Sequence, residues 1–192
     1  HDEFVGKLKA RAAELTIGDP ADENTGRRPL CNVATLERAS AHAEDARAKG
    51  AKVVTIPDGA APDPAIRRIP PTLLVGATDA MQVMREEIFG PILPVESYAR
   101  LDDAIAAVTR RPRPLAFYVF AEDRVVRERL LRETIAGGVT VNDTLWHFAH
   151  EELPFGGVGA SGIGAYHGEA GFRTFSHMKS VFAQPRLAAA KL

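Results

Sequence analysis

Apolar residues near the beginning of the chain recur with helical spacing. Between positions 2 and 15 they stand three or four residues apart, with charged side chains between them: Phe4, Val5, Leu8, Ala12 and Leu15. This pattern predicts an amphipathic helix, which the run Gly18-Asp19-Pro20 ends, and the polar residues 24–26 continue the loop. A second helix is predicted over residues 34–49. Gly50 follows it, in the position where a left-handed backbone closes a helix.

The middle of the chain alternates between short apolar runs and helical segments. The runs predict strands over residues 51–56, 73–75, 115–120 and 138–141. Helices are predicted over residues 102–109 and 123–134, each opened by an aspartate that can cap free backbone amides. Runs that are apolar throughout are typical of strands covered on both faces. The order strand, helix, strand, helix, strand over residues 92–142 therefore predicts an α/β layered fold.

The composition is that of an ordinary folded protein and excludes several classes of partner. Of the 192 residues 45% are hydrophobic, enough to bury the core of one large domain or two small ones. The 24 basic residues do not exceed the 25 acidic ones, so no surplus of positive charge is available to bind nucleic acid. No apolar run approaches the roughly 20 residues that cross a bilayer. We therefore expect neither a nucleic-acid partner nor a membrane span.

A single cysteine, Cys31, excludes an intrachain disulfide and a four-cysteine metal site. It favours a reducing compartment, and the expected location is the cytoplasm. The histidines His147, His150, His167 and His177 lack a metal-ligand spacing, so no metal site is expected. Because the chain begins with His1 rather than Met, we expect that sequence upstream has been removed or left out.

Two carboxylates stand close to an aromatic residue just before the strand expected at Ile92. Glu86 and Glu87 precede Phe89, and the pair Gly90-Pro91 forms a break. A carboxylate near a strand end can accept hydrogen bonds from ribose hydroxyls, and a neighbouring aromatic side chain can pack against a flat ring. The alternative is that the glutamates are solvated charges at a helix end and that Phe89 belongs to the core. Spacing alone leaves both interpretations open.

Residues 154–168 are rich in glycine, so their backbone can adopt positive φ angles and approach other groups closely. The segment is not a phosphate-binding loop of a known pattern, because no lysine follows at the required spacing and no strand leads directly through it into a helix. It is predicted to be a tight structural loop, neither helix nor strand over most of its length.

Together these motifs resemble the aldehyde dehydrogenase superfamily. The resemblance rests on residues 86–91, followed by 154–157 and 161–162, and it extends from Phe4 to about Phe182. Residues 164–168 and 172–177 are similar to the class 3 branch, which includes bacterial coniferyl aldehyde dehydrogenases. The resemblance implies part of the α/β catalytic domain over residues 1–175, a layered and mostly parallel sheet with flanking helices. It also implies a subunit-joining strand and tail over residues 176–192, with the dinucleotide-binding domain largely absent.

The resemblance also implies a site. Glu87 would bind the nicotinamide ribose hydroxyls of NAD or NADP, Glu86 would be a less critical neighbour, and Phe89 would help to hold the nicotinamide. Residues 142–147 would border the substrate tunnel, in which Trp146, Phe148 and Phe155 suit an aromatic aldehyde such as coniferaldehyde. The alternative for these three aromatic side chains is a place in the core.

Members of this family attack the aldehyde with a cysteine thiolate, transfer a hydride to the nicotinamide, and release the acid with water activated by a glutamate. By resemblance both residues lie upstream of His1, so no catalytic residue is expected in this chain. Cys31 is interpreted as an ordinary small apolar residue. The complete enzyme would oxidise aldehydes, and this fragment alone would not.

A homodimer is expected from the strand at residues 176–184, for which an edge strand of the same domain is the alternative. The missing upstream strands should also leave an apolar face and a sheet edge uncovered, which favours association. The main alternative function is a non-catalytic assembly or interaction module that retains the fold. A related acyl-phosphate reductase fits residues 166–168 and 172–177 poorly.

Overall fold

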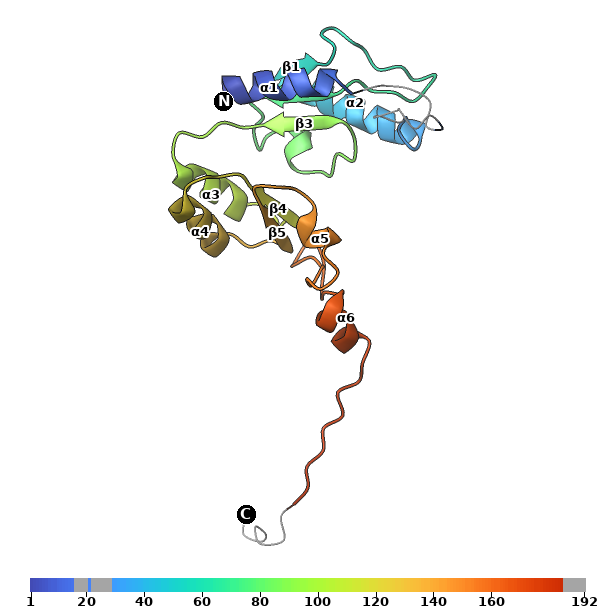
Figure 1. The fold of residues 1–192 in the computed structure, drawn as a ribbon. Helices are drawn as coiled ribbons and strands as arrows, with labels where there is room; N and C mark the ends of the chain where they lie inside the picture. Colours follow the sequence, from blue (N-terminus) through green and yellow to red (C-terminus); the bar gives the residue numbers. More distant parts are fainter. Residues whose placement is uncertain (16–20, 22–28, 185–192) are drawn as a thin grey trace. The chain divides into compact units, whose positions relative to one another are not determined.

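The computed structural model describes residues 1–15, 21 and 29–184, which form two compact units, His1–Ser97 and Tyr98–Leu192. Each unit has its own sheet (Figure 1). The sequence pattern did not predict this division. The loop expected at residues 18–20 and 24–26 and the tail from residue 185 lie outside the described residues.

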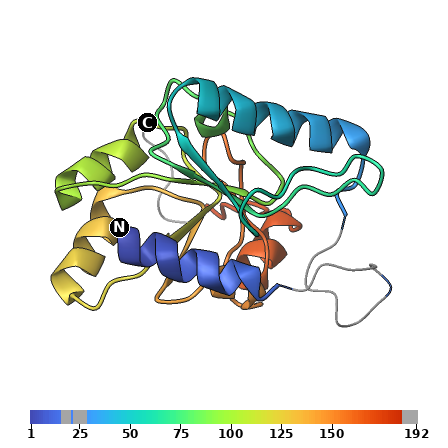
Figure 2. The ribbon, with the colours of Figure 1, turned by 90° about the horizontal axis from the view of Figure 1, so that it is seen from above.

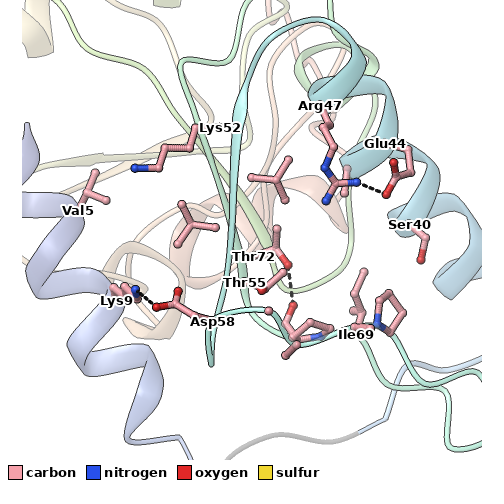
Figure 3. A pocket seen from close by; sticks show the side chains of 18 residues that line it. Val5, Lys9, Ser40, Glu44, Arg47, Lys52, Thr55, Asp58, Ile69 and Thr72 are labelled. Carbon is pink, nitrogen blue, oxygen red and sulfur yellow. Dashed lines mark hydrogen bonds and ion pairs between the residues drawn. The ribbon is translucent and has the colours of Figure 1, made fainter.

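The first unit contains a three-stranded sheet in the order β1-β2-β3. Its elements are α1 (Asp2–Ala13), α2 (Val33–Ala48), β1 (Lys52–Thr55), β2 (Thr72–Val75), the 3-10 helix η1 (Gln82–Met84) and β3 (Ile92–Val95). β2 pairs antiparallel with β1 and parallel with β3. Figures 2 and 3 show α1 and α2 on either side of β1. The predicted helices and strands of this half of the chain are therefore confirmed.

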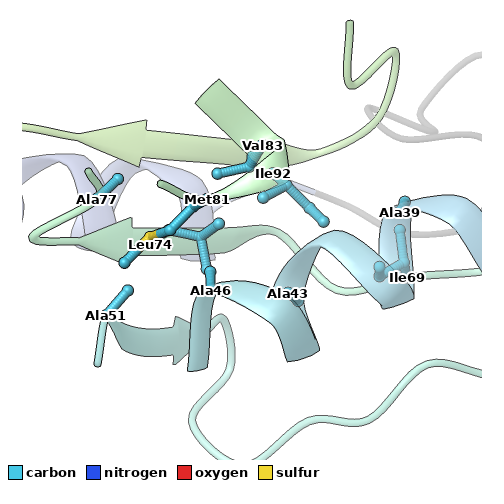
Figure 4. Packing of buried hydrophobic residues seen from close by; sticks show 10 residues of the cluster. All are labelled: Ala39, Ala43, Ala46, Ala51, Ile69, Leu74, Ala77, Met81, Val83 and Ile92. Carbon is cyan, nitrogen blue, oxygen red and sulfur yellow. The ribbon is translucent and has the colours of Figure 1, made fainter. Parts of the chain in front are cut away.

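The core of the first unit lies between α2 and the sheet. Small side chains on one face of α2 let the helix approach the sheet closely, and larger ones from β2, β3 and the segment around η1 fill the space (Figure 4). The buried cluster comprises Ala39, Ala43, Ala46, Ala51, Ile69, Leu74, Ala77, Met81, Val83 and Ile92. Asn32 begins α2 by accepting the backbone N–H of Thr35 at 2.8 Å, and Gly50 ends it with φ +92°, as predicted.

The second unit alternates helices and strands in the predicted order. Its elements are α3 (Leu101–Thr109), β4 (Ala116–Val119), α4 (Arg124–Glu133), β5 (Gly138–Val141), α5 (Trp146–Ala149) and α6 (Gly168–Thr174). β4 and β5 pair in parallel, with Ala116 opposite Gly138, and α4 makes the crossover that parallel strands require. Because two of the three ladders in the described chain are parallel, the prediction of a mostly parallel α/β fold is confirmed.

One of the two predicted aspartate caps is wrong. Asp123 caps α4 as expected, accepting the N–H of Val125 at 2.7 Å. α3, however, begins at Leu101 with Arg100 at its N-cap, and the carboxylate of Asp102 accepts from the side chains of Arg100 and Arg129 instead of backbone amides. Asp103 takes that role instead, accepting the backbone N–H of Arg100 at 3.1 Å.

Residues 176–184 continue beyond α6 as an exposed extended segment (Figure 1). They pair with no strand in the part of the chain that the structure describes, and the alternative of an edge strand of the same domain stays a prediction. A strand that joins subunits needs a second chain and stays a prediction. Among the described helices, none has the length and apolarity to cross a bilayer.

Candidate functional site

The glutamate motif forms an exposed loop between η1 and β3. Glu86 and Glu87 are exposed, and Phe89 exposes 76% of its surface in a left-handed conformation with φ +47°. Ile88, between them, packs against the core. The interpretation of Phe89 as a core residue is therefore wrong, whereas the two exposed glutamates, which follow the end of η1, agree with the alternative of solvated charges at a helix end.

Sequence reasoning missed the residue that supports this loop. Arg38 of α2 donates from Nη1 to the carbonyl oxygen of Glu87 at 2.6 Å and from Nη2 to that of Ile88 at 3.3 Å. Neither contact involves a glutamate side chain, so the carboxylate of Glu87 stays available to a ligand. The only signal in the sequence was an arginine on the polar side of a predicted helix.

This loop presents an acceptor and a flat apolar ring to solvent within three residues. An ionised carboxylate accepts hydrogen bonds from vicinal hydroxyls, and an exposed phenyl ring packs against a planar heterocycle. The contact of Glu87 and Phe89 with a nicotinamide ribose and ring stays a prediction.

Aromatic side chains gather in the second unit around Phe155. Its ring is 5.0 Å from that of Phe148, 5.6 Å from that of Tyr166 and 5.9 Å from that of His167, measured between centroids. The backbone N–H of Phe155 donates to Tyr166 at 2.7 Å, and that of Tyr166 donates back at 2.9 Å. Phe148 exposes 48% of its surface and Tyr166 47%, so this ring cluster is not a closed core.

Trp146, the third predicted pocket residue, is not part of this cluster. Its indole N–H donates to Asp143 Oδ2 at 2.9 Å, and the residue is 61% exposed. No ring contact joins it to Phe148 or Phe155 within the described residues. The structure thus brings two of the three predicted pocket residues together.

The glycine-rich segment is a tight loop, as predicted. A Cβ atom on Gly156 would lie 2.1 Å from the carbonyl oxygen of Gly164, and one on Gly157 would lie 2.1 Å from that of Ser161. Isolated bridges join Phe155 to Tyr166 and Gly159 to Gly162. The glycines therefore let the backbone fold onto itself and set Phe155 beside Tyr166.

A buried polar contact missed by the sequence lies beneath the ring cluster. Thr140 Oγ1 is 2.9 Å from His147 Nδ1 and accepts the backbone N–H of His147 at 3.1 Å. The His147 ring lies 5.7 Å from the ring of Tyr118 and 6.3 Å from that of Phe155. A Cβ on Gly138 would lie 2.3 Å from His147 Cδ2, so glycine is required there.

The remaining candidates lie apart from both motifs. Cys31 is exposed, and its Sγ lies 3.3 Å from Thr35 Oγ1. Within residues 1–15, 21 and 29–184, no group of three His, Cys, Asp or Glu side chains could hold a metal ion.

A hollow of about 740 Å³ lies in the first unit beside β1, between α1 and α2 (Figure 3). Two ion pairs lie in its lining: Lys9 of α1 with Asp58 at 2.6 Å, and Arg47 with Glu44, both of α2. It contains none of the predicted site residues.

The chain belongs to the aldehyde dehydrogenase family, whose sequence profile matches residues 1–181. It is 49% identical to a probable coniferyl aldehyde dehydrogenase of Pseudomonas aeruginosa, over 100% of this chain and 39% of the relative. Among solved structures, it is 39% identical to a substrate-bound AldH of Staphylococcus aureus, with a TM-score of 0.81 over 98% of this chain and 40% of that one. A lactaldehyde dehydrogenase of Escherichia coli matches with 28% identity and a TM-score of 0.85, over 96% and 38%. The chain thus spans about two fifths of the length of these relatives.

Proposed function

We propose that this chain is the C-terminal portion of an aldehyde dehydrogenase that oxidises an aromatic aldehyde such as coniferaldehyde to the carboxylic acid, using NAD or NADP. The observation that carries the proposal is the exposed loop in which Glu87 and Phe89 project beside the half-buried Ile88. The similarity to coniferyl aldehyde dehydrogenases of Pseudomonas aeruginosa and Caulobacter vibrioides, 49% and 52% identical, supports the choice of substrate. The single exposed cysteine supports a reducing compartment, the cytoplasm.

In this proposal Glu87 and Phe89 supply one half of a cofactor site. NAD or NADP, when bound there, would supply the hydride acceptor for the oxidation. The Glu87 carboxylate accepts hydrogen bonds from the nicotinamide ribose, and the Phe89 ring limits the orientation of the nicotinamide. Phe148 and Phe155, together with the exposed ring of Trp146, provide apolar area for an aromatic aldehyde. The cysteine nucleophile and the glutamate base are contributed by sequence outside these 192 residues.

Replacement of Glu87 tests the cofactor role. In the complete natural enzyme, Glu87→Gln keeps the shape of the side chain and removes its charge, so a charge-assisted hydrogen bond is lost. We expect the KM for cofactor to rise about tenfold, with little change in the KM for aldehyde. Glu86→Gln is the matched control and should change the cofactor KM much less. An equal effect of the two substitutions would contradict the assignment of Glu87.

The isolated 192-residue chain provides a second test. We expect it to show no turnover of an aromatic aldehyde with NAD or NADP, because the proposal assigns both the nucleophile and the base to sequence outside this chain. The complete enzyme under the same conditions is the positive control. Turnover by the isolated chain would sink this part of the proposal, and an inactive complete enzyme would favour the alternative of a non-catalytic assembly module.

A further inference from the structure

A stripe of polar side chains on α2 faces the segment that leads into β3. Arg38, His42, Asp45 and Lys49 are spaced four, three and four residues apart, so they lie along one side of the helix. This stripe runs next to the buried alanines of the core face of α2. It is therefore well placed to hold a segment that crosses the edge of the core.

The C-terminal half of the stripe fixes the beginning of that segment. Lys49 Nζ donates to the carbonyl oxygen of Ala80 at 2.8 Å, and Asp45 Oδ2 accepts the backbone N–H of Gln82 at 2.8 Å. The hydrogen bond from Lys49 and that from the Gln82 amide lower the pKa of the Asp45 carboxyl, which keeps it ionised and able to accept. The start of η1 is thus tied to α2.

The N-terminal half of the stripe fixes the loop itself. The His42 ring is 1% exposed, and its Nε2 lies 3.8 Å from Glu86 Oε2. Arg38 donates to the carbonyl oxygens of Glu87 and Ile88. Taken with the two contacts of the other half, residues 80–88 run antiparallel to α2 and are held at both ends.

The loop needs this support because its own backbone is unfavourable. Phe89 has φ +47°, a region that a residue with a Cβ occupies only where the surroundings hold it there. The carbonyl groups of Glu87 and Ile88 lie outside helix and strand, so they need partners from elsewhere. Arg38 donates a hydrogen bond to each of these two carbonyl oxygens from one planar guanidinium, whose two N–H groups fit two neighbouring acceptors.

We propose that Arg38 is a positioning residue for cofactor binding, which fixes the backbone of residues 87 and 88 so that Glu87 and Phe89 are presented in the conformation the cofactor requires. This inference rests on the proposed function of Glu87 and Phe89. His42 fills the space behind the loop and keeps Glu86 on the side of α2, away from the ligand. Arg38 itself touches neither cofactor nor substrate.

The test is Arg38→Ala in the complete enzyme, with two independent measurements. Hydrogen exchange of the amides of residues 86–90 should accelerate about tenfold or more, because the loop loses both hydrogen bonds from the Arg38 guanidinium. NADH and NADPH are titrated separately, and binding is monitored by nicotinamide fluorescence. The dissociation constant of whichever of these two cofactors the enzyme uses should rise about tenfold. The KM for aldehyde should remain unchanged.

Two variants make the result specific to Arg38. Arg38→Lys retains the charge but offers no planar fork, and should recover only part of the loss in both measurements. Arg47→Ala removes an arginine of the same helix that pairs with Glu44 within α2, and should alter neither measurement. An Arg38→Lys variant whose hydrogen exchange and cofactor affinity match those of Arg38→Ala would still support the inference. It would assign the effect to the planar guanidinium and not to the charge.

The outcomes separate this inference from the proposed function. Unchanged exchange in Arg38→Ala would overturn the support role, whatever the cofactor does. Accelerated exchange with unchanged cofactor affinity would also overturn it, provided that Glu87→Gln weakens binding. If Glu87→Gln leaves binding intact, the proposed cofactor role of the loop itself fails.

Discussion

At the scale of single residues, Gly156 and Gly157 are required because backbone atoms of their own loop lie too close to admit a Cβ atom. A Cβ on Gly156 would lie 2.1 Å from the carbonyl oxygen of Gly164 and 2.9 Å from Ala165 Cα. Both are backbone atoms, so no side-chain rotation can relieve the overlap. Gly156→Ala must therefore separate the two arms of the loop that hold Phe155 beside Tyr166.

We expect Gly156→Ala to destabilise the fold by about 1–3 kcal/mol, as overpacking in a tight region does. Thermal and urea unfolding would measure the change. Gly6→Ala is the control, since a Cβ there meets nothing within 4 Å and the residue is inside α1. It should leave stability unchanged or raise it by up to about 1 kcal/mol. A Gly156→Ala variant as stable as Gly6→Ala would contradict the contact geometry.

At the scale of elements, an ion-pair network joins α3 to α4 in the second unit. Arg129 of α4 lies 2.7 Å from Asp102 and 2.8 Å from Glu133, and Arg100 lies 2.9 Å from Asp102. Hydrogen bonds from Arg129 and then Arg100 lower the pKa of Asp102, and that from Arg129 lowers the pKa of Glu133. The same carboxylates raise the pKa of Arg129, which stays charged throughout.

A carboxyl whose pKa is lower in the folded state stabilises that state above its unfolded pKa, and the contribution is lost as the pH falls through the folded value. We therefore expect the second unit to lose stability as the pH drops from about 5 to about 3. Urea midpoints across this range provide the measurement. Asp102→Asn should be less stable than the wild type at neutral pH and should show a shallower decline. Equal slopes would mean that this network contributes nothing.

At the scale of the whole molecule, the chain exposes many large apolar side chains. Near the C-terminus they include Phe172, Phe175, Met178, Val181 and Phe182, each at least 75% exposed. In the sheet of the second unit only Val119 of β4 and Thr140 of β5 are buried, and Phe120 just beyond β4 is 66% exposed. Apolar surface of this extent on a folded chain marks a place where other chains bind.

We therefore expect the isolated chain to associate with itself, or with the upstream part of the enzyme where both are present. Light scattering at micromolar concentration would measure it, and a monomer would count against the prediction. The double variant Val181→Asp and Phe182→Asp should weaken association, because both side chains are exposed and neither supports the core. If it does not, the contact lies elsewhere, and the predicted role of residues 176–184 in joining subunits fails.

The sequence by itself determined the local elements and the family. Four features could be predicted from local pattern: the helix α2, its end at Gly50, the cap at Asp123 and the parallel pairing of β4 with β5. Each depends on neighbours within a few residues or on continuous apolarity. The motifs at residues 86–91 and 154–157 sufficed for the resemblance that the family match bears out.

Only the tertiary structure decided which residues meet. Arg38 and Glu87 are 49 positions apart, so no local pattern links them, and Phe89 could equally have been buried on spacing alone. Trp146 likewise lies apart from Phe148 and Phe155, and its indole N–H donates to Asp143 instead. The physical reason is the same in each case: contacts between distant segments are fixed by packing and hydrogen-bond geometry in three dimensions, whereas periodicity specifies only which side of an element a residue occupies.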